Sequence, residues 1–81
     1  MRVTVRLFAR LRDIVGVAQL SRELPEGATA SLLWNMLAAE HAGLAAYRDA
    51  VSIAVNAEYS KMSRRLADGD EVAFLPPVSG G

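Results

Sequence analysis

The feature that most constrains the fold is a pair of short alternating segments, one near each end of the chain. In the first, Val3, Val5 and Leu7 fall on one face, and Arg2, Thr4 and Arg6 fall on the other. A period of two residues is typical of a half-buried strand. The second segment, residues 71–75 (EVAFL), is equally apolar and stops at two prolines, which cannot donate a backbone hydrogen bond to a sheet. Two such apolar strands suit neighbouring central positions.

Between these segments the sequence predicts one amphipathic helix from Ala30 to His41, with Thr29 as its N-cap and Gly43 placed to end it. The apolar residues expected on its buried face are Leu32, Leu33, Met36 and Leu37. Trp34 lies off this stripe, and we expect it to be a flanking core contact.

The remaining segments predict additional strands and turns. We expect a short helical or looped crossing over 11–16, a strand over 18–24, a loose connection over 42–50, a strand over 51–55 and a short return over 59–66. Asn56 and Gly69 suit turns because both residue types tolerate left-handed backbone angles. One helix serving four or five strands indicates an α+β fold of the β-grasp (ubiquitin-like) type, with a mixed four- to five-stranded sheet packed against one main helix. We assign residues 1–75 to this domain and 76–81 to a flexible tail.

Composition excludes several classes of function. The chain has 81 residues and no cysteine, so disulfides, thiolate metal sites and a cysteine nucleophile are impossible. Lysine plus arginine and aspartate plus glutamate both number 9, which argues against a nucleic-acid binder. No apolar run approaches the ~20 residues of a membrane span, and the start of the chain is strand-like rather than signal-like. We therefore expect a cytoplasmic protein without a membrane partner.

The candidate catalytic and ligand-binding side chains have simpler structural explanations. His41 falls at the expected C-terminal end of the helix, where its imidazolium would interact favourably with the helix dipole. The acidic cluster Asp68, Asp70 and Glu71 lacks the spacing of a calcium loop and is better explained as a turn. Arg2, Arg6, Arg10 and Arg12 give the N-terminal segment a basic edge, which we interpret as a solvated face or, less favourably, a docking surface for an acidic partner. No phosphate-binding GxxxxGK[ST] loop is present, so self-contained catalysis is not expected.

The last six residues, PPVSGG, are the most informative for function. The two prolines end the strand and direct the chain away from the domain. Gly80 and Gly81 add no width beyond the backbone, so this segment can thread a narrow channel and present its terminal carboxylate inside another protein. That carboxylate is ionised at neutral pH and inert towards nucleophiles. It needs activation by a partner, for instance as an acyl-adenylate. The competing interpretation is a floppy end without function.

Phe8 breaks the polar-out rule at the end of the first strand. The periodicity alone leaves two interpretations open: the chain bends and Phe8 enters the core, or Phe8 stays outside for a partner.

Three segments, LFARLRDIVG, Val55-Asn56 and LADGDEVAFLPPVSGG, give the chain its resemblance to a known family. Together they resemble the small subunit of molybdopterin synthase, the MoaD family, from end to end. The C-terminal block is the most specific part, because Gly-Gly ends are shared by several ubiquitin-like sulfur carriers.

The resemblance implies a sulfur carrier in molybdenum cofactor biosynthesis. An E1-like (MoeB-type) enzyme would adenylate the Gly81 carboxylate with ATP and magnesium, and a persulfide system would convert it to a thiocarboxylate. The tail would then enter the large (MoaE-type) synthase subunit and donate sulfur to cyclic pyranopterin monophosphate, within a heterotetramer. The chain itself would bind no cofactor and would be a non-catalytic subunit.

The resemblance also implies the residues that contact the partners. Gly81 carries the chemistry and Gly80 gives it access. The remaining contacts map to Phe8, Tyr59, Leu75, Pro76, Pro77, Val78 and Ser79, and the outward alternation of Leu75 places it on the same face as Phe8 if the first and last strands are parallel. This favours the interface interpretation of Phe8. Three alternatives remain: a carrier for thiamine or tRNA thiolation, a ubiquitin-like protein modifier, and an interaction domain without chemistry at its end.

Overall fold

Strands β1 (Arg2–Leu7) and β5 (Glu71–Leu75) lie side by side at the centre of the sheet, as the sequence predicts. They run parallel, which is the condition for Phe8 and Leu75 to share a face. The computed structural model describes residues 1–77. Within it, β2 (Gln19–Glu23) pairs antiparallel with β1, and β3 (Ser52–Val55) pairs antiparallel with both β5 and β4 (Glu58–Ser60). The strand order is β2-β1-β5-β3-β4, so the α+β, β-grasp prediction of a mixed sheet is confirmed.

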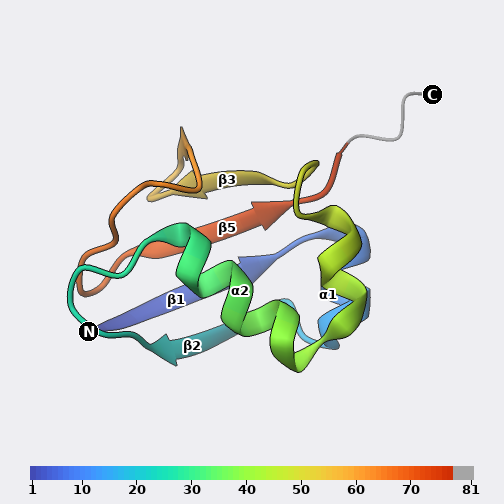
Figure 1. The fold of residues 1–81 in the computed structure, drawn as a ribbon, viewed down its shortest axis with the longest axis horizontal. Helices are drawn as coiled ribbons and strands as arrows, with labels where there is room; N and C mark the ends of the chain where they lie inside the picture. Colours follow the sequence, from blue (N-terminus) through green and yellow to red (C-terminus); the bar gives the residue numbers. More distant parts are fainter. Residues whose placement is uncertain (78–81) are drawn as a thin grey trace.

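Helix α2 (Ala30–Glu40) crosses one face of this sheet (Figure 1). The Thr29 hydroxyl caps it by accepting a hydrogen bond from the Leu32 amide, at 3.3 Å. The inward faces of β1, β3 and β5 supply the other half of the core, with Val5, Val55, Val72 and Phe74 all fully buried. The side of the sheet opposite α2 is therefore left as an outer face.

The buried stripe of α2 differs from the prediction. Its core residues are Ala30, Leu33, Trp34 and Leu37, which follow the i, i+3, i+4, i+7 spacing of a single helix face. Leu32, expected in the core, is 37% exposed. Trp34, expected at the flank, is 1% exposed and packs against Phe74 with ring centroids 5.1 Å apart. The large indole fills the helix–sheet interface better than Leu32, whose position points away from the sheet.

The connections are more regular than the sequence indicates. Residues 9–15 form α1 (Ala9–Val15), which ends at Gly16 in the left-handed region, with φ of 95°. Helix α2 ends at His41 rather than at Gly43. The expected loose connection is a 3-10 helix, η1 (Ala42–Tyr47), because Leu44 is fully buried and anchors it to the core.

The turn residues of the sequence form one hydrogen-bonded unit. Asn56 and Ala57 both have positive φ, at 51° and 69°, and form the two-residue β3–β4 hairpin loop. The Asn56 side-chain amide donates to Asp70 Oδ1 and its Oδ1 accepts from the Glu71 amide, both at 2.9 Å. Asp68 Oδ1 accepts from the Arg2 amide at 2.7 Å. The acidic cluster therefore organises the turn before β5, as interpreted above.

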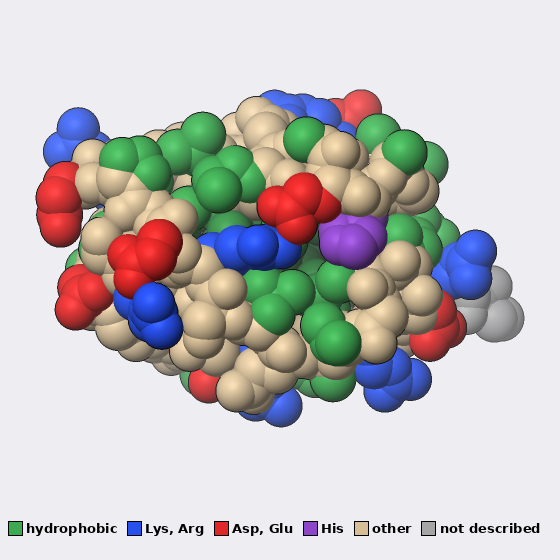
Figure 2. Space-filling view, turned by 90° about the horizontal axis from the view of Figure 1, so that it is seen from below, with side chains coloured by type: hydrophobic (Ala, Val, Ile, Leu, Met, Phe, Trp, Pro, Cys, Tyr) green, Lys and Arg blue, Asp and Glu red, His purple; other side chains and the backbone are tan. Residues whose placement is uncertain are grey.

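The face in Figure 2 mixes hydrophobic, acidic and basic side chains with the single histidine, and no continuous basic surface is visible on it. None of the helices in residues 1–77 is long and apolar enough to cross a bilayer. Of the predicted tail, residues 76 and 77 are described, whereas 78–81 lie outside the described residues.

Candidate docking patch and tail exit

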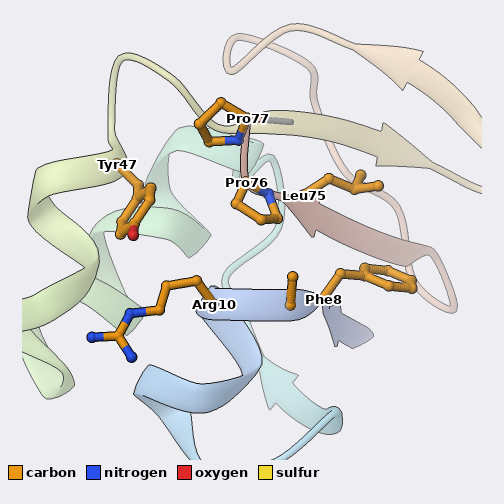
Figure 3. Close-up of a pocket in the computed structure, with 7 residues that line it drawn as sticks. Phe8, Arg10, Tyr47, Leu75, Pro76 and Pro77 are labelled. Atoms are coloured by element: carbon orange, nitrogen blue, oxygen red, sulfur yellow. The ribbon is translucent and has the colours of Figure 1, made fainter. Parts of the chain in front are cut away.

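Phe8 and Leu75 reach the same face because β1 and β5 are parallel. Leu7 pairs with Phe74 in the register, and both point into the core. The residues that follow them therefore point to the outer face. Both Phe8 and Leu75 are half-buried, and Figure 3 shows their side chains directed to the same side.

A strained turn sets the orientation of Phe8. Phe8 is extended, with φ of −123° and ψ of 149°, and the next residue, Ala9, has φ of 51°. An L-residue in the left-handed region costs about 1–2 kcal/mol, and here it turns the chain from β1 directly into α1. The Arg6 guanidinium lies 5.4 Å from the centre of the Phe8 ring, and Arg6 also pairs with Glu71 at 3.6 Å. The ring is thus held on the outer face of the sheet.

Tyr59 extends this surface across the sheet. Its side chain is 78% exposed. Tyr59 pairs with Ala54, which pairs in turn with Ala73 of β5. Ala54 therefore lies between Tyr59 and Ala73, and Ala73 is on the same strand as Leu75. We define the docking patch as Phe8, Tyr59 and Leu75, together with Ala54 and Ala73.

A groove of about 650 Å³ adjoins the docking patch at the point where the described chain ends. Its lining residues are Phe8, Ala9, Arg10, Tyr47, Leu75, Pro76 and Pro77. Pro76 is half-buried and Pro77 is exposed. Figure 3 shows Tyr47 and Arg10 on one side of Pro76, and Phe8 and Leu75 on the other. We call this the exit groove, because β5 leads into it.

The other predicted candidates lie apart from this site or outside the description. Val78, Ser79, Gly80 and Gly81 fall outside the described residues. His41 is the C-cap of α2, and Trp34 is a core residue. Among residues 1–77, no three histidine, aspartate or glutamate side chains gather as a metal ion would require.

Three residues of the exit groove, Ala9, Arg10 and Tyr47, were not predicted as site residues. Arg10 appeared only as part of a basic edge, and Tyr47 belonged to a segment expected to be irregular. The groove forms where η1, which contacts α1 and α2, places Tyr47 opposite the end of β5, and the buried Leu44 anchors η1. A single buried leucine in an alanine-rich connection without periodicity gives little sequence signal.

The sequence matches the model of the ThiS family over residues 5–81, nearly its whole length. The chain belongs to the ThiS family.

Individual relatives show which members of the ThiS family this chain resembles. Proteins named molybdopterin synthase sulfur carrier subunit from Arabidopsis thaliana and Homo sapiens are each 37% identical. The alignments cover 98% of this chain, and 82% and 93% of the two relatives. The resemblance to molybdopterin synthase small subunits is therefore confirmed.

Solved structures share the whole fold. The SAMP1 protein of Haloferax volcanii superposes with a TM-score of 0.87 at 27% identity, and the match covers all of both chains. A chain in a complex of subunits 1 and 2 of the molybdopterin-converting factor from Helicobacter pylori matches with a TM-score of 0.69 at 27% identity, also over all of both chains. Both matches extend over the whole of this chain, so the two neighbours share its β-grasp fold.

Proposed function

We propose that this protein is the sulfur carrier subunit of a molybdopterin synthase, with the Gly81 carboxylate as the reacting group. The observation that carries the proposal is the parallel β1–β5 pair. It brings an outward aromatic, an outward leucine and the Pro76–Pro77 exit to one edge of the domain. The 37% identity to sulfur carrier subunits over nearly the whole chain supports it.

Activation of the carboxylate takes place on an E1-like partner that holds ATP and magnesium. A Gly81 carboxylate oxygen attacks the α-phosphorus of ATP and pyrophosphate leaves, which converts an inert anion into an acyl-adenylate. The terminal sulfur of a protein persulfide then attacks the acyl carbon, and AMP leaves. A second thiol breaks the sulfur–sulfur bond and is oxidised to a disulfide, so that the thiocarboxylate remains. All the sulfur and thiols come from partners, since this chain has no cysteine.

Sulfur transfer takes place in the large synthase subunit. The thiocarboxylate sulfur attacks a carbon of cyclic pyranopterin monophosphate and displaces the oxygen substituent of that carbon, which leaves with a proton. Water then hydrolyses the acyl–sulfur bond, which restores the carboxylate and leaves the sulfur on the substrate. The tail enters the partner while the docking patch holds the domain against it. Partly exposed apolar side chains beside the end of β5 suit this role, because their burial stabilises a complex without a change in fold. The solved complex of subunits 1 and 2 of the molybdopterin-converting factor from Helicobacter pylori supports a large-subunit partner, because one of its chains shares this fold.

Removal of Gly81 tests the proposal. With the E1-like partner and ATP, the full chain should release pyrophosphate and become thiocarboxylated, whereas a chain that ends at Gly80 should do neither. The thermal midpoint should be the same for both, because the core is formed by residues of the described domain. Sulfur loading of the shortened chain at the rate of the full one would contradict the proposal.

A second function is favoured by one observation, the TM-score of 0.87 to SAMP1, a protein whose solved structures include one titled small archaeal modifier protein 1. A modifier would use the same adenylate but pass Gly81 to a lysine amine of a target protein. The two functions differ in product. Epitope-tagged protein expressed in its native host should give sulfur-loaded free protein for a carrier, and a ladder of larger covalent conjugates for a modifier.

A further inference from the structure

We propose that Arg10 and Tyr47 form an anion-binding corner of the exit groove that receives a carboxylate side chain of the large synthase subunit. This contact would fix the orientation of the carrier while its tail enters that partner. The inference rests on the proposed function, since it names a second contact with the same partner.

The first observation is that Arg10 has no anionic partner in the described part of the chain. Its neighbours in the basic edge are all paired: Arg2 with Glu23 at 2.9 Å, Arg6 with Glu71 at 3.6 Å, and Arg12 with Asp13 at 3.9 Å. Among residues 1–77, no carboxylate forms a salt bridge with Arg10. Within the described residues, the charge of Arg10 is therefore not neutralised by a carboxylate.

The charge of Arg10 also has no local stabilising role. Arg10 is the second residue of α1, at the end of a helix where a cation is unfavourable and an acidic residue would be preferred. A neutral or acidic residue there would serve the fold better, so the fold alone does not explain this arginine.

The second observation is the position of Tyr47. Its ring is half-buried and lines the same groove as Arg10. Figure 3 shows its hydroxyl end directed to the side of the groove where the Arg10 side chain lies. Within residues 1–77 the hydroxyl forms no hydrogen bond with another side chain or the backbone. A guanidinium and a phenol, both available as donors, together suit one carboxylate acceptor.

Continuity with the docking patch identifies the occupant. Phe8 and Leu75 line the exit groove and also belong to the docking patch. A partner that covers the patch therefore reaches the groove. The rest of the groove is formed by alanine, leucine, prolines and aromatic rings, so a single acidic residue within an apolar segment of the partner fits it. A polyanion would need more cations than the one that the groove provides.

The experiment measures the affinity of the full-length carrier for the large subunit by titration calorimetry at two salt concentrations. We expect Arg10→Ala to weaken binding about fivefold, Tyr47→Phe about threefold and Arg10→Glu about thirtyfold, because the last change sets two like charges against each other. The salt dependence of the affinity should be smaller for Arg10→Ala than for the natural protein. The matched control is Arg65→Glu, which makes the same change in charge beside Thr29, at the start of α2.

The outcomes separate this inference from the proposed function. Weakening by Arg10→Glu with no effect of Arg65→Glu supports the anion-binding corner. Equal weakening of binding by the two variants would show that only the net charge of the carrier matters, and would overturn the anion-binding corner. Binding of the Arg10→Glu variant with unchanged affinity would also overturn the anion-binding corner. Tighter binding of this variant would overturn it too, and would indicate that Arg10 binds the chain's own terminus. If Phe8→Ala weakens binding in that case, the proposed function stands without this contact.

Discussion

Truncation of Phe8 separates docking from folding more clearly than any other single change. The ring is only half-buried in the isolated protein and lies 5.4 Å from the Arg6 guanidinium. Half of a phenylalanine's burial, together with a surface cation–π contact, is worth about 1–2 kcal/mol. For a domain of this size we expect Phe8→Ala to lower the thermal midpoint by about 5–10 °C.

The effect of Phe8→Ala on binding should be larger. An aromatic side chain at the centre of an interface is typically worth about 2 kcal/mol or more, which corresponds to about a thirtyfold rise in Kd for the large subunit. The assays are titration calorimetry for affinity and circular dichroism for the thermal midpoint. The control is Leu32→Ala, which truncates another partly exposed apolar residue, on α2 and away from the patch, and should leave Kd unchanged.

Two results would refute this reasoning. An affinity unchanged by Phe8→Ala would remove Phe8 from the interface. The second result is a fall in the thermal midpoint of Phe8→Ala as large as that of a core substitution, without a specific loss of affinity for the large subunit. It would mean that the ring stabilises the fold rather than the complex.

Three further substitutions test the account. Leu75→Ala should raise the Kd for the large subunit about tenfold, and an unchanged calorimetric Kd would remove β5 from the docking patch. Val5→Ala, at a fully buried position, should cost about 2 kcal/mol of unfolding free energy in a denaturant titration while Kd stays the same. A neutral result would mean that the faces of β1 are reversed. Ala57→Gly should stabilise the protein by about 0.5–1 kcal/mol, because φ of 69° suits glycine in this two-residue hairpin loop. A lower melting temperature would show that the turn is not strained.

The central sheet could be predicted from the sequence because its strands obey a simple alternation. Val3, Val5 and Leu7 face the core, as do Val72 and Phe74, so the inward faces of both strands follow from the alternation. The parallel direction of the pair does not follow from it, and that direction puts Phe8 and Leu75 on the same side. The shared face of Phe8 and Leu75 depends on these local patterns and on one long-range pairing. Tyr59 was implied by the family resemblance, and the β3–β4 and β3–β5 pairings bring it to the docking patch.

The parts that could not be predicted depend on tertiary packing. The helix pattern allowed two overlapping apolar stripes, and the choice between Leu32 and Trp34 was settled by which side chain fills the space above Phe74. The exit groove requires η1 to place Tyr47 opposite the end of β5, and no periodic pattern marks that arrangement. The reactive terminus was inferred from its chemistry, and its residues lie outside those described.

Intact-mass spectrometry of the protein purified from its native host tests the central claim most directly. We expect a fraction of the chain to carry the mass increase of one oxygen replaced by sulfur, located at Gly81 by fragmentation and absent from a host that lacks the E1-like partner. A terminus that remains a plain carboxylate in both hosts, while the host still makes molybdopterin, would contradict the account.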